Sequence, residues 1–195
     1  MGISVLDTKK IVYESVDCII RELFPEKYDS LCHVYAVVGA NVSSILLKKD
    51  YRPVAGLAVI DAGGGNFFKL IDNWAFYGDI GGAYHCWIES GTNSLLEKEL
   101  IDFTYKHNPD YARKNGMIWR KKKTPDYLWG LYKELVIAGN HEALPQTFPH
   151  GKVWFRETLA GSNWLSKHVE QYSEEYVRMT SIALKHATIS MENIA

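Results

Sequence analysis

The chain has 195 residues, of which 47% are hydrophobic and 23% charged, and its 22 Lys and Arg against 23 Asp and Glu give a net charge of -1. These values are typical of one soluble globular domain, which we expect to span residues 1–195. The balanced charge argues against a nucleic-acid partner, and the lack of a long apolar run argues against a membrane span.

The cysteines and the N-terminal segment indicate the compartment. Cys18, Cys32 and Cys86 show no close pairing, which favours a reducing compartment over a disulfide framework. The first 20 residues lack the basic region followed by an apolar region that a secretory signal needs. We therefore expect a cytoplasmic protein. The basic run at residues 114–123 is interpreted as solvated side chains and not as a polyanion site.

Two helices are predicted in the first 50 residues. The first has Asp7 or Thr8 as its N-cap and ends before Pro25. The second has Ser30 as its N-cap and runs to about Lys49. Because apolar residues lie on nearly every face of the second helix, we expect it to be central and buried.

The middle third of the chain has the pattern of β-strands. Four short β-rich runs are separated by glycine-rich turns and lie at residues 54–60, 67–77, 83–90 and 97–104. Four consecutive strands with tight turns predict an antiparallel meander. From about Lys106 onward we predict irregular structure and helices, the clearest at residues 162–187 with Ser162 or Asn163 as its cap. The order of helices, sheet and helices predicts an α+β domain.

A histidine and an aspartate lie on the last two of these runs. A hairpin about Asn93 and Ser94 would place Asp102 directly opposite His85, where a carboxylate fixes the tautomer and orientation of an imidazole. Cys32 would occupy the second position of the buried helix, where free N–H groups and the helix dipole favour a thiolate. The three residues supply a nucleophile, a base and an orienting carboxylate.

Structural explanations compete with this catalytic one. A cysteine is most often a small buried hydrophobe, which is our interpretation of Cys18 and Cys86, whereas Cys32 fits either role. The adjacent pairs Cys32-His33 and His85-Cys86 raise the question of a zinc site. Neighbouring strand residues point to opposite faces, so His85 and Cys86 would not bind one ion together. We expect no metal and no cofactor.

The segments "SLCHVYAVVGANV", "YHCWIE" and "LIDFT" carry a resemblance to a known family. There the sequence resembles the transglutaminase-like branch of the papain-like cysteine proteinase superfamily, and an uncharacterised bacterial family placed in it by fold. The likeness covers about residues 28–105. It implies a central buried helix packed on an antiparallel sheet, N-terminal helices, further C-terminal helices, and Cys32, His85 and Asp102 as catalytic residues. The sequence departs from papain-type enzymes at His33, where they have tryptophan, and at Glu26, where they carry an oxyanion-hole glutamine.

The expected function is thiol-dependent acyl transfer, with hydrolysis of an amide or peptide bond in a small-molecule or peptide acyl substrate as the first choice. Transfer to an amine, transglutaminase-like or arylamine N-acetyltransferase-like, is an alternative, and so is a catalytically inactive binding or scaffold protein. Oxyanion candidates besides the Cys32 backbone N–H are Asn73 and Trp74. Candidates for the substrate cleft, although core packing is the commoner role for such residues, are Trp87, Trp119, Tyr127 and Trp129.

Overall fold

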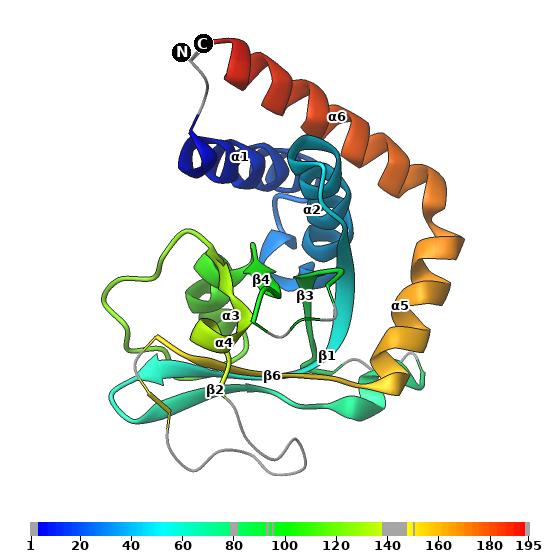
Figure 1. The fold of residues 1–195 in the computed structure, drawn as a ribbon. Coiled ribbons are helices and arrows are strands. Elements are labelled where there is room, and N and C mark those ends of the chain that lie inside the picture. Colours follow the sequence, from blue (N-terminus) through cyan, green and yellow to red (C-terminus); the bar gives the residue numbers. More distant parts are fainter. Residues whose placement is uncertain are drawn as a thin grey trace.

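The computed structural model describes residues 4–78, 82–92, 94, 96–137, 148–149 and 151–193. It shows an α+β protein in which a curled antiparallel sheet packs against helices from both ends of the chain (Figure 1). In the part of the chain that is described, no helix is long and apolar enough to cross a membrane.

Helix α1 (Val5–Leu23) starts earlier than the sequence predicts. Its N-cap is Ser4, whose Oγ accepts a hydrogen bond of 3.1 Å from the backbone N–H of Asp7. The predicted caps Asp7 and Thr8 therefore lie inside the first turn, and that prediction was wrong. Serine caps a helix as well as aspartate or threonine does, and Ser4 accepts from the N–H of Asp7. The Asp7 carboxylate then lies in the first turn, where its negative charge stabilises the positive end of the helix dipole.

Helix α2 (Cys32–Leu47) is the buried central helix that the sequence predicts, with nine residues buried. It begins at Cys32 itself, because Ser30 belongs to a short 3-10 turn, η1 (Tyr28–Ser30), where its hydroxyl donates to the carbonyl of Lys27 at 2.9 Å. The prediction of Ser30 as N-cap was wrong. Halfway along α2, Gly39 lets the helix approach the sheet: a Cβ there would lie 2.8 Å from the side chains of Ile88 and Phe103.

The sheet differs from a meander in its strand order. The order is β2-β1-β3-β4-β5, β6 also pairs with β1, and every pair of these strands is antiparallel. The strands are β1 (Tyr51–Gly63), β2 (Asn66–Leu70), β3 (His85–Ser90), β4 (Glu99–Asp102), β5 (Leu128–Leu131) and β6 (Val153–Glu157). The predicted run at 67–77 ends as a strand at Leu70, and Asn73–Phe76 form the 3-10 turn η2. This turn takes the chain away from β2, so β3 pairs with β1 and the meander prediction was wrong.

Strand β1 joins two parts of the sheet. Tyr51–Gly56 pair with β3, whereas the residues after Gly56 pair with β2 and β6. Gly56 pairs with both His85 and Glu157. A Cβ at this position would overlap the backbone carbonyl oxygen of Arg156, so the crossing point requires glycine.

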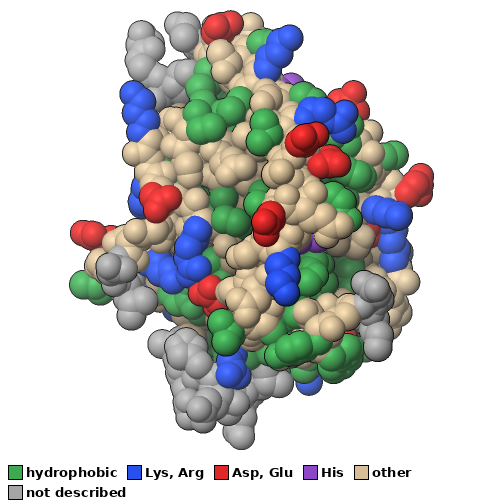
Figure 2. Space-filling view, turned by 90° about the vertical axis from the view of Figure 1, so that its right-hand side faces the viewer, with side chains coloured by type: hydrophobic (Ala, Val, Ile, Leu, Met, Phe, Trp, Pro, Cys, Tyr) green, Lys and Arg blue, Asp and Glu red, His purple; other side chains and the backbone are tan. Residues whose placement is uncertain are grey.

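The C-terminal region forms two helices where the sequence predicts one. These are α5 (Leu159–Gln171) and α6 (Ser173–Glu192), separated at Tyr172. Thr158 caps α5 by accepting a hydrogen bond from the N–H of Gly161, so the predicted caps Ser162 and Asn163 were wrong. α6 packs against α1 and α2. Figure 2 shows acidic and basic side chains interspersed over the face on which α5 lies.

Three short segments complete the fold: the 3-10 turn η3 (Tyr105–His107) and the helices α3 (Asn108–Lys114) and α4 (Tyr132–Leu135). η3 is tied to the helical layer by a buried network. Nε2 of His107 lies 2.6 Å from Oδ1 of Asp17 in α1 and 3.2 Å from the hydroxyl of Tyr35 in α2. The network fixes the start of α3 against the N-terminal half of the chain.

Candidate active site

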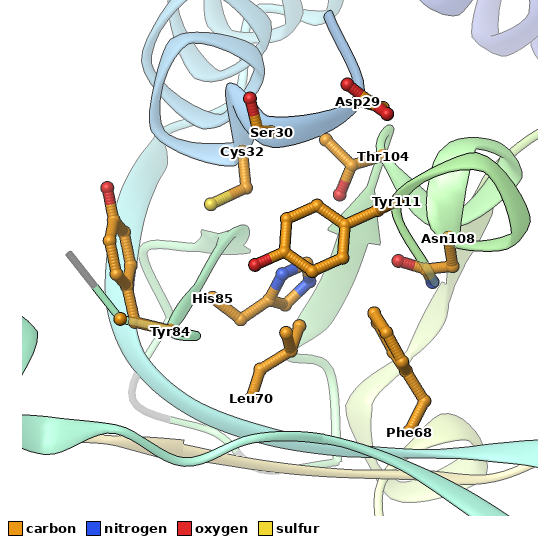
Figure 3. Close-up of a pocket in the computed structure, with 11 residues that line it drawn as sticks. Asp29, Ser30, Cys32, Phe68, Leu70, Tyr84, His85, Thr104, Asn108 and Tyr111 are labelled. Carbon is orange, nitrogen blue, oxygen red and sulfur yellow. The ribbon is translucent and has the colours of Figure 1, made fainter. Parts of the chain in front are cut away.

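A small pocket of about 110 Å³ lies between the N-terminus of α2, the start of β3 and helix α3 (Figure 3). Cys32 and His85 both line it, and they meet there because each is the first residue of its element. The other described lining residues are Asp29, Ser30, Phe68, Leu70, Gly82, Tyr84, Thr104, Asn108 and Tyr111.

His85 and Asp102 form a buried pair. The two residues are 2% and 1% exposed, and Nε2 of His85 lies 3.0 Å from Oδ2 of Asp102. The other oxygen of Asp102 accepts hydrogen bonds from the backbone N–H of Thr104 at 2.9 Å and from its hydroxyl at 2.7 Å. These bonds fix the carboxylate, and the carboxylate orients the imidazole so that Nδ1 is the nitrogen left for the pocket.

The predicted register between the strands of His85 and Asp102 was wrong by two residues. Ile88 pairs with Ile101 and Glu89 with Leu100, so Asp102 does not lie directly opposite His85. Asn93, on which the predicted turn was centred, lies outside the described residues. A slip of two residues keeps every side chain on its face of the sheet, and His85 and Asp102 therefore still meet as diagonal neighbours.

The electrostatics of the pocket favour an ion pair between Cys32 and His85. Burial alone would lower the pKa of His85, but the charge and hydrogen bond of Asp102, followed by Cys32, raise it to about 10. The pKa of the partly exposed Cys32 thiol lies well below its usual value. Among the described residues, no hydrogen bond of ordinary length joins Cys32 to His85, and such contacts often tighten when substrate binds.

Cys18 and Cys86 were both interpreted as small buried hydrophobes, and for Cys18, which is exposed, that interpretation was wrong. Cys86 is buried and is a neighbour of Cys32. Its thiol is the largest influence that lowers the pKa of Cys32, burial opposes it, and the imidazoles of His33 and His85 lower the pKa further. Cys86 itself is 1% exposed, and its pKa is raised well above the usual value by burial, then by its hydrogen-bonding interaction with Cys32 and by the negative charge of Cys32. Cys86 therefore stays protonated, and the negative charge is carried by Cys32.

The predicted oxyanion donors do not reach the pocket. Asn73 and Trp74 lie in η2 and are absent from the described lining, and the Trp74 side chain is 55% exposed. They were expected on a strand leading to the site. Because β2 ends at Leu70, η2 turns them away, and the prediction was wrong.

The predicted cleft aromatics are absent from the described lining of the pocket, and they pack in or against the hydrophobic core. Trp87 is 1% exposed, lies behind His85 on the same face of β3, and donates its indole N–H to Glu89 at 3.0 Å. Tyr127 and Trp129 are partly buried and pack against the core formed with α1 and α2. Trp119 is also partly buried and packs beside Phe68. These positions correct the prediction of a cleft formed by Trp87, Trp119, Tyr127 and Trp129.

The walls of the pocket opposite Cys32 were not predicted from the sequence. Phe68 and Leu70 come from β2, and Asn108 and Tyr111 come from α3. The short helix α3 carries no recognisable motif, so no pattern indicated that it would line the site. The bond between the Thr104 backbone N–H and Asp102 did have a local signal, because an aspartate side chain commonly accepts from the backbone N–H two residues later.

The described residues contain no group of three His, Cys, Asp or Glu side chains arranged to hold a metal ion. The described site brings together a thiol of lowered pKa, an imidazole of raised pKa and a carboxylate fixed by hydrogen bonds.

Neither a protein-family model nor a curated protein matches the sequence. Among solved structures, the chain is similar to a crystal structure described as "genomics APC5867". The identity is 16% and the TM-score 0.52, over 89% of this chain and 77% of the other. At this identity the similarity shows a related α+β fold and nothing about activity.

Proposed function

We propose that this protein is a cysteine hydrolase that cleaves an amide or peptide bond through Cys32, His85 and Asp102, on a core related to papain-like and transglutaminase-like enzymes. The observation that carries the proposal is the 3.0 Å contact between His85 and Asp102 in a pocket that Cys32 also lines. A central helix that starts with the cysteine and packs on an antiparallel sheet supports the relation to that fold.

The proposed reaction begins with the ion pair. The Cys32 thiolate attacks the substrate carbonyl carbon, and the carbonyl electrons move onto oxygen. When the C–N bond breaks, Nδ1 of the His85 imidazolium gives its proton to the departing amine. His85 then removes a proton from water, which attacks the thioester; the acid leaves, and the Cys32 thiolate and His85 imidazolium are restored. Throughout, Asp102 accepts the Nε2–H hydrogen bond and holds the ring in the required tautomer.

Two groups are placed to donate to the oxyanion. One is the backbone N–H of Cys32, which lies in the first turn of α2, where N–H groups have no partner within the helix. The other is the hydroxyl of Tyr111, which Figure 3 shows on the side of the ring that faces Cys32. Burial, followed by the nearby negative charge of Cys32, raises the pKa of Tyr111. The hydroxyl therefore stays protonated at neutral pH and able to donate.

The proposal is tested by turnover of a panel of acyl p-nitroanilides by the wild type and by Cys32→Ala. We expect hydrolysis in the wild type and none above background in Cys32→Ala, whereas Cys18→Ala, which removes an exposed thiol on α1, retains it. Activity that survives Cys32→Ala would refute the proposal.

The same assay separates the alternative functions. Release of p-nitroaniline without added amine indicates hydrolysis, because water resolves the thioester. Release that requires an added amine would replace hydrolysis with acyl transfer of the transglutaminase-like or arylamine N-acetyltransferase-like kind. Absence of Cys32-dependent release with either acceptor would favour an inactive binding or scaffold protein.

A further inference from the structure

Asn108 has an unsatisfied amide at the wall of the pocket. It is the first residue of α3 and is 5% exposed, and its side-chain Nδ2 is buried with no hydrogen-bond partner among the described residues. Leaving such a donor unpaired is unfavourable, and a correctly placed acceptor on a ligand removes that cost. Figure 3 shows Asn108 and Cys32 on opposite sides of the pocket, with Tyr111 and His85 between them.

We infer that Asn108 binds the end of the substrate's acyl group remote from the reacting carbonyl, and that this end is a neutral carboxamide. The inference rests on the proposed function, since it takes Cys32 as the nucleophile. Asn108 would then determine specificity. The acyl group would consist of a short body next to the reacting carbonyl and a polar end that binds Asn108.

The chemistry of the amide selects a carboxamide. An asparagine side chain presents a donor and an acceptor next to each other, and a ligand carboxamide presents the complementary acceptor and donor. An alkyl group of the same shape would leave the buried amide unpaired. The body of the acyl group would contact Phe68 and Leu70, which are 1% and 4% exposed and supply the apolar wall.

The charges around the pocket argue against a carboxylate at the same position. No Lys or Arg is among the described lining residues. The nearby Lys114 is paired with Asp29, with Nζ at 2.9 Å and 3.0 Å from its two carboxylate oxygens. A ligand carboxylate beside Asn108 would therefore lose its hydration without a Lys or Arg to pair with, and the His85 imidazolium is already paired with Asp102. A neutral carboxamide costs much less to dehydrate.

The small volume of about 110 Å³ limits the length of the acyl group. Drug-sized ligands occupy pockets of roughly 300–1,000 Å³. The pocket therefore fits a short chain with one carboxamide, of the size of a glycinamide or asparagine side-chain unit.

Three chloroacetamides of matched size test the inference without requiring hydrolysis. They are the chloroacetyl derivatives of glycinamide, isobutylamine and glycine, which end in a carboxamide, an isopropyl group and a carboxylate. In each, the Cys32 thiolate forms an S–C bond to the methylene carbon and chloride leaves with the C–Cl electron pair. Peptide mass mapping then gives the alkylation rate of Cys32, with exposed Cys18 as an internal reference.

We expect the glycinamide reagent to alkylate Cys32 roughly 10-fold or more faster than either of the others. The isopropyl group leaves the Asn108 amide unpaired, and the carboxylate can accept from Nδ2 only by burying a charge. Asn108→Leu should reduce this preference to about 2-fold, and Asn108→Asp serves as a second variant that keeps the size of the side chain. Asn163→Leu, an exposed position on α5, should keep the wild-type preference.

The outcomes separate this inference from the proposed function. Equal alkylation by the glycinamide and isobutylamine reagents, or preference for the carboxylate, would overturn the role of Asn108 and leave Cys32 as the nucleophile. Alkylation of Cys32 no faster than that of Cys18 by every reagent would overturn both. The wild-type comparison decides the first point even if neither Asn108 variant folds.

Discussion

Asp102→Asn should slow the reaction of Cys32 with iodoacetamide at pH 6. The asparagine oxygen can still accept the two hydrogen bonds from Thr104. Its NH₂ group then faces Nε2 of His85, so Nε2 must become an acceptor and the ring proton moves to Nδ1. His85 would lose both the charge that raises its pKa to about 10 and the tautomer that accepts a proton from Cys32.

The size of the effect follows from the thiolate fraction. A thiol with the ordinary pKa of about 8.5 is ionised to roughly 0.3% at pH 6, so complete loss of the pKa shift would slow labelling by about 300-fold relative to a fully ionised thiol. Cys86 and His33 remain in the variant and retain part of the shift. A less acidic thiol also gives a more nucleophilic thiolate. We therefore expect a reduction of at least about 10-fold at pH 6, shrinking to less than about 2-fold at pH 9, where an ordinary thiol is already mostly ionised.

The assay is the ratio of Cys32 to Cys18 labelling by peptide mass mapping, since Cys18 is exposed and reports the reagent itself. Asp126→Asn is the matched control, because Asp126 is an exposed carboxylate paired with Lys106. A Cys32-to-Cys18 ratio at pH 6 that is the same in Asp102→Asn and the wild type would show that Asp102 does not control the thiol, and the triad would be refuted.

Three further changes test other parts of the structure. Tyr111→Phe should lower kcat for an acyl p-nitroanilide by roughly 100-fold. The rate of Cys32 labelling by iodoacetamide should stay within about 2-fold of the wild-type rate, because alkylation forms no oxyanion. A parallel loss in both assays would contradict the oxyanion role. Burial, followed by the charge of His33, lowers the pKa of His168 to about 4. Between pH 6.5 and 4 the unfolded chain therefore binds a proton at this residue that the folded protein does not. The free energy of unfolding should fall as pH drops through that range. His168→Phe should make this fall smaller in urea unfolding at pH 7, 5 and 4, and an unchanged fall would exclude His168 as its source. Gly56→Ala should destabilise the protein by about 3 kcal/mol or more, because its Cβ would overlap the Arg156 carbonyl. Gly78→Ala, whose added Cβ would meet no described atom within 4 Å, should change the free energy of unfolding by no more than about 0.5 kcal/mol. Similar unfolding midpoints for the two variants would count against the packing at Gly56.

The candidate triad was predictable because it depends on local sequence patterns: the alternation of side chains along a strand and the distribution of apolar residues along a helix. Strand alternation placed His85 and Asp102 on one face whatever the exact register, provided that the slip was even. The apolar pattern of α2 placed Cys32 near a helix start even though its cap was misassigned. The register itself was not predictable, because it depends on the geometry of a turn that the sequence does not specify.

The opposite wall of the pocket depends on contacts that are distant in sequence. Asn108 and Tyr111 reach the site because η3 is held by His107 against Asp17, about 90 residues earlier in the chain. No local pattern encodes that contact. Strands β5 and β6 were missed for a related reason: they have only four and five residues, and their pairing with β4 and β1 is what makes them strands.

The two-part pairing of β1 has a consequence for how fast the protein folds. Its hairpin with β2 closes within a few residues, whereas Gly56 and Glu157 must meet across about 100 residues of chain. Contacts so far apart in sequence impose their entropic cost before they contribute stability, which slows folding. Gly56 also pairs with His85 in β3. Pairing of β6 with β1, which comes late because of the sequence distance, therefore completes the sheet beside the imidazole. On a ribosome, Cys32, His85 and Asp102 would all have been synthesised well before the segment that finishes their framework.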